Sequence, residues 1–562
     1  MQEAADLVSI GVPSEGPLAS DPIKPDLNSI KPHDEERAKV VLYAASMAFG
    51  TLTSRVLGLV REMAFAAFFG RTVTDAWTAA FRLPNLFRRL LGEGSLSVSF
   101  IPVFVEARLA DPEQNGQPSV RAKNLVNSFY TLLLVVLSVL TVLGIIFAEP
   151  VLNLLLDPKY LEVAGKMALT VRFARIMFGF IFLMSTYAFF MGILNALGKY
   201  ALAAMAPTFF NVAMIVSTLL PNRFFSVEGD GLAWGVLVGG LLQTLVLVPS
   251  LISKGYFPSF SFQWRNPDIY RIFKSMAGGF IGLGLMQITT LVNMRFASHL
   301  GEGAISYIYW ADRLLELPLS LVSVSLGTAL LPTLAAMWSR KEATRMSETT
   351  HFYLRLNLFV AIPSALGLYF LARPIVELLF QRGHFSSDDT LATATVVQIY
   401  SLILVPTSCV RVLAPAYYAV KNTWFPALVS GFSLIVHVII APILMRNYGL
   451  SGLNFSAFVS SGLNFILLLG LYSRFITSFQ WAHLGVQTLK FFVPGLCMAG
   501  TLLLYPFWRG LMLENFLGHL LSLGFALMLA AIVYLGISTL MRLEENTATV
   551  ERVYKKIFRR RN

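Results

Sequence analysis

Charged residues are scarce in this sequence. Asp, Glu, Lys and Arg make up 14% of its 562 residues, and apolar residues make up 56%. Soluble domains average about 25% charged and about 45–50% apolar residues. This composition excludes a disordered chain, and it excludes a string of soluble domains because the stretches between apolar runs are too short to fold alone. The sequence is that of a polytopic membrane protein.

Cysteine is nearly absent as well. The two cysteines, Cys409 and Cys497, lie inside apolar stretches, which excludes a disulfide framework and a cysteine metal site. The seven histidines show no HxxH or HExxH spacing, and no Walker A or glycine-rich dinucleotide motif occurs. Metalloenzyme chemistry and direct coupling to ATP therefore have no support. We expect neither an enzyme nor a bound cofactor.

Long uncharged windows are what the sequence does have. Residues 129–148, 232–252, 425–445 and 517–541 contain no Asp, Glu, Lys or Arg, and a helix of about 20 apolar residues crosses the roughly 30 Å hydrocarbon core. With weaker windows included, the sequence predicts an all-α protein of fourteen spans. They are expected near 38–60, 73–106, 124–148, 168–196, 201–221, 229–253, 272–298, 305–337, 351–372, 390–419, 424–446, 450–473, 487–506 and 517–541.

The two ends of the chain differ from the spans. Residues 1–39 hold five prolines and many acids without an apolar segment, so we expect a disordered cytosolic tail. With the N-terminus inside, the cytoplasmic connections carry fourteen Lys and Arg and the opposite ones nine, and the tail 542–562 adds seven. Positive loops stay inside, so both termini are expected in the cytoplasm. Basic loops facing anionic lipid, and not nucleic acid, explain the net charge of +12.

A weak internal repeat suggests two halves. The similar pairs are 95–102 with 323–332, and 188–207 with 413–426. Their offset corresponds to six spans, which predicts two lobes of six helices, 40–253 and 254–473, and a C-terminal pair within 474–541. In transporters such repeats place the substrate site at their interface. Chance similarity between apolar segments is the alternative.

The most informative residues are charges inside the expected spans. A charge at the bilayer centre costs roughly 2.5–3.5 kcal/mol on insertion scales, so it normally faces a partner or a wet cavity. Arg55 and Glu62 are seven residues apart and share one face of the first span. Other expected spans carry Asp75, Arg82, Arg88, Arg89, Glu93, Arg172, Arg175, Asp312, Arg313, Glu316 and Arg411.

Arginine outnumbers acid in the first two spans together. The guanidinium is a planar fork that matches phosphate or carboxylate and stays charged when it leaves water. The expected cargo is therefore anionic, and a diphosphate is a good candidate. The alternative for several of these arginines is a structural ion pair or a side chain that reaches the membrane interface.

Three blocks of sequence resemble the MurJ (MviN) family. The first contains SRVLGLVRE at 54–62, TDAW at 74–77 and RLPNLFRR at 82–89, followed by GEG. The second begins at Tyr309 with YWADRLLELP and continues through LGTALLP, and the third is VLAPAYY at 412–418. The resemblance covers the chain from residue 40 to the last span, and the order of several long motifs makes it specific.

The resemblance implies a lipid II flippase of peptidoglycan synthesis in the bacterial inner membrane. This family belongs to the multidrug/oligosaccharidyl-lipid/polysaccharide exporter superfamily and has two six-helix lobes around a central cavity. Two C-terminal helices form a groove for the polyprenyl tail. The implied substrate-binding residues are four cavity arginines, two neighbouring headgroup positions and one functionally sensitive acid: Arg55, Arg61, Arg88, Arg313, Ser54, Glu62 and Asp75.

The expected mechanism is alternating access, with the arginines holding the diphosphate of lipid II. A flippase for another polyprenyl-linked glycan, a drug exporter of the same superfamily and a non-transporting scaffold for cell-wall enzymes are the alternatives. Membrane lipids and cell-wall synthesis proteins are expected partners. Some family members bind sodium in the second lobe, but spans seven and eleven contain no acidic cluster for it.

Overall fold

All regular secondary structure in the described part of the chain is helical. The computed structural model describes residues 31–90, 96–111, 118–263, 265–320, 325–512 and 514–546. The expected all-α fold is therefore confirmed. Most of the expected N-terminal and C-terminal tails, and Glu93 with its flanking glycines, lie outside these residues.

The first group of helices, called the N-lobe below, ends at Ser253. Helix α8 packs against α1 and α9, and α2 packs against α6. The bounds are α1 Lys31–Phe68, α2 Arg71–Phe87, α3 Ser97–Ala110, α4 Val120–Ile146, α5 Ala148–Leu155, η2 Pro158–Glu162, α6 Lys166–Met177, α7 Gly179–Ala196, α8 Tyr200–Leu219, η3 Asn222–Phe224, α9 Asp230–Leu245 and α10 Val248–Ser253.

The second group, the C-lobe, is followed by a C-terminal pair formed by α19 and α21, which pack on each other and on α14 and α15. The bounds are α11 Pro267–His299, α12 Ala304–Leu319, α13 Ser325–Ser339, α14 Ala343–Phe370, α15 Ala372–Phe380, α16 Ser387–Ala419, α17 Trp424–Gly470, α18 Tyr472–Phe475, α19 Trp481–Leu503, α20 Tyr505–Gly510 and α21 Phe516–Leu540.

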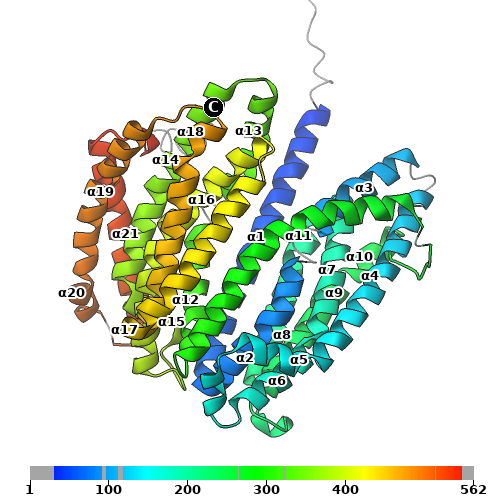
Figure 1. The fold of residues 1–562 in the computed structure, drawn as a ribbon, viewed down its shortest axis with the longest axis horizontal. Helices are drawn as coiled ribbons and strands as arrows, with labels where there is room; N and C mark the ends of the chain where they lie inside the picture. The colour runs from blue at the N-terminus through cyan, green and yellow to red at the C-terminus, as the bar shows by residue number, and fades with distance from the viewer. Residues whose placement is uncertain are drawn as a thin grey trace, which may run out of the picture.

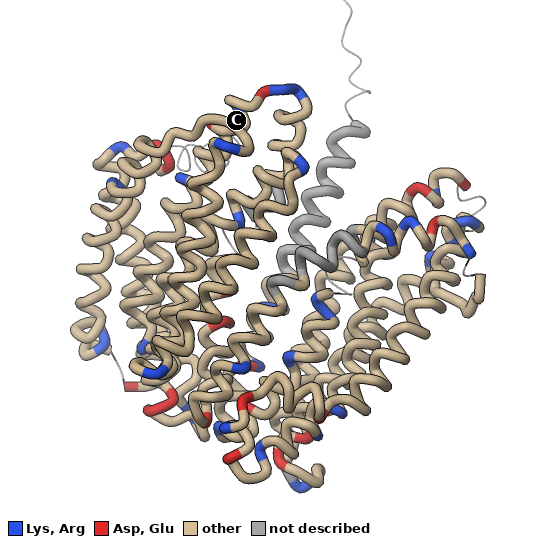
Figure 2. The backbone as a smooth tube through the Cα atoms, in the orientation of Figure 1, with Lys and Arg blue, Asp and Glu red and all other residues tan. Residues whose placement is uncertain are grey.

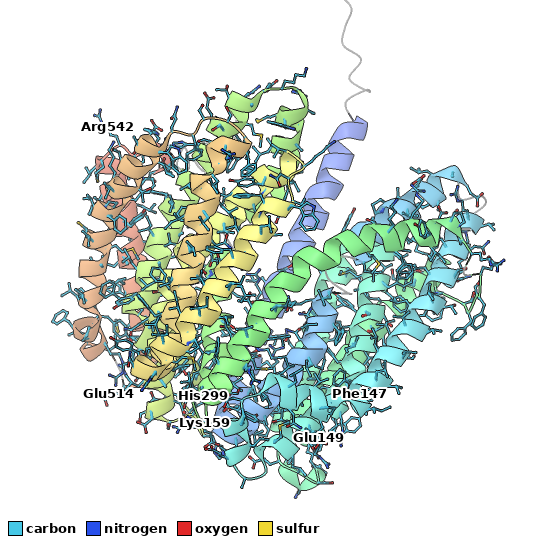
Figure 3. The ribbon with its side chains drawn as sticks, in the orientation of Figure 1. Phe147, Glu149, Lys159, His299, Glu514 and Arg542 are labelled. Carbon is cyan, nitrogen blue, oxygen red and sulfur yellow. The ribbon has the colours of Figure 1, made fainter. Side chains whose placement is uncertain are left out.

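The two lobes converge at one end and diverge toward the other (Figure 1). Helix α11 lies between them and contacts α3 and α5 of the N-lobe as well as α12 and α17 of the C-lobe. Figure 3 labels Lys159, His299 and Glu514 at the converging end and Arg542 at the opposite end. The first described turns of α1 lie on the same side as Arg542, so both ends of the described chain share one face.

Nine helices in the described ranges are long and apolar enough to cross a membrane. Each of the fourteen expected windows contains helix, but the count itself stays a prediction. Helices α1, α2 and α12, which carry most of the charges singled out above, are not among the nine, and α2 and α12 are short, with 17 and 16 residues. Most of the charged residues gather toward the two ends of the helices (Figure 2).

Helix α17 contains two of the expected spans. Its 47 residues would extend about 70 Å if straight, twice the hydrocarbon thickness. Gly449 breaks it with φ of 54° and ψ of −129°. Beyond that point the halves run antiparallel, since the Ser460 hydroxyl donates to the Ser433 carbonyl at 2.7 Å and the Asn464 amide to Ser430 Oγ at 3.2 Å. The expected boundary near residue 449 matches this hairpin.

Two helix boundaries differ from the sequence-based expectation. Helix α1 begins at Lys31, inside the segment expected to be a tail, and continues to Phe68 instead of ending near residue 60. Pro32 and the acids that follow it suit a first helical turn, which explains the early start. The second expected span is broken into α2 and α3, as its internal prolines and glycines suggest.

The end of α21 is tied to α14 by a buried arginine. Arg355 Nε donates to Glu545 Oε1 at 2.5 Å, and its Nη2 donates to Glu544 Oε2 at 2.7 Å. Hydrogen bonding to the Arg355 guanidinium lowers the pKa of Glu544, so this contribution to stability is lost as the pH falls through that lowered value. The contact fixes the C-terminal pair against the C-lobe.

Replacing Gly449 by Ala should destabilise the α17 hairpin. The observed φ and ψ lie in a region that is nearly restricted to glycine, and a side chain there costs of order 1–3 kcal/mol. We expect a lower melting temperature of the detergent-purified protein. The melting temperature is measured by size-exclusion chromatography after heating. Gly431→Ala is the matched control, because Gly431 lies in the same helix with a negative φ and open space around its Cα. Equal melting of the two variants would contradict this role of Gly449.

Candidate functional site

Three helices bring charged side chains together between the lobes. Helices α1 and α2 belong to the N-lobe and α12 to the C-lobe. On α12, Tyr309, Arg313 and Glu316 are four and three residues apart, a spacing that places them on one helical face. On α1, Arg55 and Glu62 share a face in the same way. These faces contact each other across the lobe boundary.

Glu62 is the centre of this contact. Glu62 is only 3% exposed. Its carboxylate accepts a hydrogen bond from the Tyr309 hydroxyl at 2.8 Å and forms an ion pair with Arg61. Arg313 Nε lies 3.7 Å from the same carboxylate. A buried carboxylate costs several kcal/mol unless it is paired and hydrogen-bonded. The C-lobe supplies two of these three partners, so Glu62 favours the closed arrangement of the lobes.

These contacts leave part of the Arg313 side chain exposed. Its side chain is 31% exposed, its guanidinium lies 4.9 Å from the centre of the Tyr309 ring, and Nη1 is 3.1 Å from Glu316 Oε2. The ring face attracts the cation and fixes its orientation. An exposed edge of the guanidinium therefore stays accessible to an anionic ligand.

Helix α8 organises the N-lobe part of the site through Asn211. Arg61 Nη1 donates to Asn211 Oδ1 at 3.0 Å, and Asn211 Nδ2 donates to the Ser54 carbonyl at 2.8 Å. One side-chain amide thus connects Ser54 and Arg61. Because α1 extends to Phe68, Arg61 lies within the helix and not at its end, where the hydropathy windows place it.

The other arginines of the site lie on α1, on α2 and directly after α2. Arg55 is exposed, and its Nη1 donates to Ser320 Oγ at 2.8 Å, at the end of α12. Arg88, directly after the end of α2, donates from Nε to Asn85 Oδ1 of that helix at 2.8 Å. Arg82 and Arg89 pair with α12, at 3.8 Å from Asp312 and 3.9 Å from Glu316.

The balance of charge at the site is positive. Six arginines, on α1, on α2 and the two residues after it, and on α12, accompany three carboxylates. The arginines are Arg55, Arg61, Arg82, Arg88, Arg89 and Arg313, and the carboxylates are Glu62, Asp312 and Glu316. A site for cationic drugs would require the opposite balance, so the arrangement suits a ligand with more than one negative charge.

Asp75 lies apart from the exposed arginines. It is completely buried and accepts hydrogen bonds from Lys166 Nζ at 2.7 Å, from the Gly303 amide at 2.7 Å and from the Ser306 amide at 2.9 Å. The two amides belong to the N-terminus of α12, whose partial positive charge favours a carboxylate. In this conformation Asp75 caps a helix of the other lobe and has no surface that a ligand could reach.

Further polar contacts join the lobes at the converging end. Asp389 at the start of α16 accepts a hydrogen bond from Arg71 Nε of the N-lobe at 2.6 Å. Within the C-lobe, the Tyr307 hydroxyl donates to the same carboxylate at 2.6 Å and holds it in place. The backbone amide of His384 donates to the carbonyl of Ala67 at 2.9 Å. Together with the contacts of Asp75, these bonds close the lobes against each other at this end.

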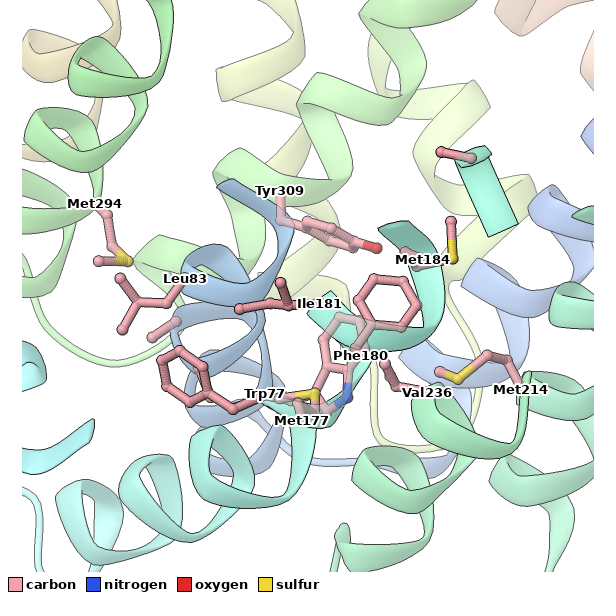
Figure 4. Close-up of a cluster of buried hydrophobic side chains, with 14 of the residues drawn as sticks. Trp77, Leu83, Met177, Phe180, Ile181, Met184, Met214, Val236, Met294 and Tyr309 are labelled. Atoms are coloured by element: carbon pink, nitrogen blue, oxygen red, sulfur yellow. The ribbon is translucent and has the colours of Figure 1, made fainter. Parts of the chain in front are cut away.

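An aromatic cluster lies beside the polar contacts. Tyr309 of the C-lobe packs near Trp77 and Phe180 of the N-lobe (Figure 4), with 6.2 Å between the Tyr309 and Trp77 ring centres. Phe65 lies 4.9 Å from Trp77 and 6.2 Å from Trp310. The lobe contact is therefore apolar on one side of Glu62 and charged on the other.

Sequence reasoning missed three residues of these networks. Tyr309 could be found as the residue one turn before Arg313, and Asn211 as a polar residue inside an apolar span. Lys166 is 1% exposed and paired with Asp75, and this partner is too distant in sequence to be recognised from the sequence. No group of three His, Cys, Asp or Glu that could hold a metal occurs among the described residues, and the expectation that the protein binds no cofactor stays untested.

Comparison with known proteins identifies similar chains. The sequence model described as "Lipid II flippase MurJ" matches residues 65–544. A protein of Bdellovibrio bacteriovorus named "Probable lipid II flippase MurJ" is 50% identical over 512 residues, covering 91% of this chain and 96% of the relative. The Burkholderia cenocepacia protein named "Lipid II flippase MurJ" is 35% identical over 445 residues, covering 78% and 85% of the two chains.

Solved structures share the fold. A structure titled "Lipid II flippase MurJ, inward closed conformation" matches with a TM-score of 0.69 and 24% identity over 88% of this chain and 98% of that one. An inward-facing multidrug transporter of the MATE family, within the MOP superfamily, matches with a TM-score of 0.63 and 12% identity over 77% and 95%. At these identities the structural matches establish the fold alone.

Removing the Tyr309 hydroxyl should weaken the lobe contact. Tyr309→Phe keeps the ring and its packing but removes one of the hydrogen bonds to the buried carboxylate of Glu62, which is then left with Arg61 as its hydrogen-bond donor. A hydrogen bond to a charged group contributes about 1.5–3 kcal/mol. We expect a lower melting temperature of the purified protein. Tyr369→Phe serves as the control because Tyr369 is exposed. If both variants melt like the wild type, the bond to Glu62 contributes nothing to stability.

Proposed function

The chain belongs to the lipid II flippase MurJ family, and from this membership we propose that it moves lipid II from the cytoplasmic to the outer leaflet of a bacterial inner membrane. The observation that carries the proposal beyond the family name is the excess of arginine at the contact of the two lobes. The family is one of membrane transporters, and cell-wall synthesis is the process that consumes its lipid.

The diphosphate of lipid II is the group that these arginines suit. A guanidinium binds phosphate oxygens through two parallel hydrogen bonds and remains charged in a site of low dielectric. Arg313 and Arg55 are the partly exposed cations on opposite sides of the lobe boundary. A diphosphate held by both would neutralise the excess charge. In the absence of substrate, Glu62 and Glu316 compensate part of that charge.

Alternating access follows from the difference between the two ends of the molecule. The converging end is closed by the bonds that Asp75 forms with Gly303 and that Arg71 forms with Asp389, while the lobes diverge toward the end that carries Arg542 (Figure 3). We assign the diverging end to the cytoplasm, since basic loops and tails stay inside. Lipid II would bind from that side, and rocking of the lobes would exchange the bonds at the two ends.

The membrane potential can drive the outward step. Moving one elementary charge through 100 mV changes the free energy by about 2.3 kcal/mol. The cytoplasmic side is negative, so a headgroup with several negative charges gains free energy on leaving it. This source of energy needs no nucleotide site, and the sequence contains no Walker A motif.

The proposal is tested by the accessibility of lipid II in cells of the host during depletion of this protein. A lipid II-cleaving enzyme added from outside reports the outer pool, and the total precursor is quantified in parallel. We expect cleavage to fall while intact precursor accumulates. Unchanged cleavage would contradict lipid II as the cargo and favour another polyprenyl-linked glycan. Loss of cell-wall synthesis without precursor accumulation would favour the scaffold.

Arg313→Ala should abolish flipping while the protein stays folded. Removal of the guanidinium takes away the bidentate contact that Arg313 is proposed to make with the diphosphate. Arg313→Lys should also be impaired, because a point charge on a flexible stem does not reproduce the planar fork. Complementation of the depleted strain measures the effect, and membrane levels of each variant are checked in parallel. Arg373→Ala, on the exposed surface of α15, is the control; full activity of Arg313→Ala would refute this assignment.

Locking the converging end should stop transport reversibly. The backbone amide of His384 donates to the carbonyl of Ala67 at 2.9 Å, so the two lobes are in direct backbone contact at this point. With Cys497 replaced by Ser, the pair Ala67→Cys and His384→Cys should cross-link under oxidation and block flipping, and reduction should restore it. The pair Ser430→Cys and Asn464→Cys, within one lobe, is the control. Flipping by the cross-linked lobe pair would contradict alternating access.

A further inference from the structure

A second cluster of charged side chains lies on the N-lobe, away from the boundary of the lobes. Helices α5, α6 and α9 border a cavity of about 570 Å³ there, a volume within the range of small-ligand pockets. Glu149 of α5, Arg172 and Arg175 of α6 and Trp234 of α9 line this cavity, which we call the α5–α6–α9 pocket. Figure 3 labels Glu149 on the N-lobe near the converging end.

The pocket lies at the level where the uncharged part of α4 ends. From residue 125 to its end at Ile146, α4 contains no Asp, Glu, Lys or Arg, and this stretch extends about 33 Å, enough to cross a hydrocarbon core of roughly 30 Å. Glu149 is the next charged residue along the chain. Trp234 is 50% exposed and belongs to a residue type that gathers at the membrane interface. With the converging end assigned to the outer side, the pocket faces the outer leaflet.

Arg172 is fixed in place but keeps a donor for a ligand. Its Nε and Nη2 donate to Asp230 at 2.7 and 2.8 Å, and Asp230 is buried. The side chain of Arg172 nevertheless stays 45% exposed, and its Nη1 meets no acceptor in the described ranges. Asp230 therefore orients the guanidinium and leaves one of its edges open to the pocket.

Arg175 and Glu149 form a weak ion pair at the rim of the pocket. Arg175 Nη2 lies 3.4 Å from Glu149 Oε2, and the two side chains are 48% and 58% exposed. An ion pair between exposed side chains contributes little to stability, because ordering both side chains offsets much of the attraction. A ligand that carries both an anion and a cation can replace this pair at little cost and satisfy both side chains.

The charge balance of the pocket selects a ligand with no net charge. Two arginines face two carboxylates, those of Glu149 and Asp230. A phosphate suits the arginine forks, and a primary ammonium offers three N–H donors to Glu149. An anionic headgroup without an ammonium would leave Glu149 without its cation. The four charged side chains therefore match a phosphate and an ammonium on the same molecule.

An apolar stripe continues from the pocket along α9. Trp234, Val238, Leu241 and Leu245 are four, three and four residues apart, which places them on one helical face. Each of them is between 44% and 50% exposed. An acyl chain can lie along this stripe while its headgroup occupies the pocket. A free phosphate would leave the stripe unused, so the arrangement favours a lipid.

We propose that the α5–α6–α9 pocket binds a zwitterionic aminophospholipid, such as phosphatidylethanolamine, from the outer leaflet. The phosphate of the lipid contacts Arg172, Arg175 and the indole N–H of Trp234, and its ammonium contacts Glu149. One acyl chain lies along the stripe of α9. The binding is non-covalent and does not depend on the proposed flippase function, from which only the assignment of the leaflet is taken.

Native mass spectrometry of the delipidated, full-length protein tests the site. The protein is titrated with phosphatidylethanolamine, phosphatidylcholine and phosphatidylglycerol of identical acyl chains. Phosphatidylethanolamine should bind at least about tenfold more tightly than phosphatidylcholine, whose methylated ammonium has no N–H to donate to a carboxylate. Phosphatidylglycerol should also bind more weakly than phosphatidylethanolamine, because it lacks the ammonium.

Variants of the weak ion pair locate the preference on the protein. Glu149→Ala should bind phosphatidylethanolamine and phosphatidylcholine with affinities within about twofold of each other, while Arg175→Ala should bind all three lipids more weakly. Glu106→Ala is the matched control. Glu106 pairs with Arg271 at 3.0 Å, and these side chains are 55% and 51% exposed, much like the pair in the pocket. This control should bind the lipids like the wild type.

The comparison of lipids on the wild type needs no variant, so the test does not depend on how a variant folds. Equal affinity of the wild type for phosphatidylethanolamine and phosphatidylcholine would overturn the proposal. An unchanged preference in folded Glu149→Ala would overturn it as well, and tighter binding of phosphatidylglycerol would show a site for anionic lipid instead. Lipid binding is measured here without transport, so the flippase function can stand or fail separately.

Discussion

The structure depends on one buried carboxylate at the boundary of its lobes. Glu62 comes from the N-lobe, while Tyr309 and Arg313 come from the C-lobe, and each would be costly to bury alone. Because the carboxylate satisfies part of two guanidinium charges, the empty site is tolerable within the membrane. The remaining positive charge is what a diphosphate can neutralise. The same arginines thus contribute to the stability of the empty protein and to its affinity for the substrate.

The lobes are joined by contacts that can be exchanged. At the converging end, Asp75 caps the N-terminus of α12, and Asp389 binds Arg71 and Tyr307. Water can replace such partners when the end opens, whereas the apolar interior within each lobe has no comparable substitute. Opening would also separate the rings of Phe65 and Trp310. This division between exchangeable and permanent contacts lets rigid lobes rock without unfolding.

Much of the architecture could be predicted from the sequence because apolar helices of membrane length are a strong local signal. The sequence predicted the span boundary near Gly449, and its prolines and glycines indicated the break between α2 and α3. The number of spans was harder to predict, since charged residues lower the apolar character of α1, and α2 and α12 are short, with 17 and 16 residues. The expected first span also ended too early, near Arg61. A hydropathy window counts a charged residue as polar even when that residue is paired with a partner from another helix.

The site was only partly predictable for a related reason. Arginines within apolar segments stand out in a sequence, and the family resemblance selects among them. The burial of Asp75 does not stand out, because the helix end that it caps follows more than 200 residues later. Asn211, which joins Ser54 to Arg61, is likewise a lone polar residue until α8 packs on α1. Partners distant in sequence decide whether a charge faces a ligand or a neighbouring helix.

Recognition of a diphosphate by arginines at the lobe boundary is the central claim, and competition binding tests it most directly. Labelled lipid II is bound to the purified protein and displaced by a polyprenyl diphosphate or by the corresponding monophosphate. The account predicts that the diphosphate displaces lipid II at least about ten times more effectively than the monophosphate does. The diphosphate can make bidentate contacts with both arginines, whereas the monophosphate loses one of them. Equal displacement by the two lipids would contradict it and move recognition to the sugar, the peptide or the tail.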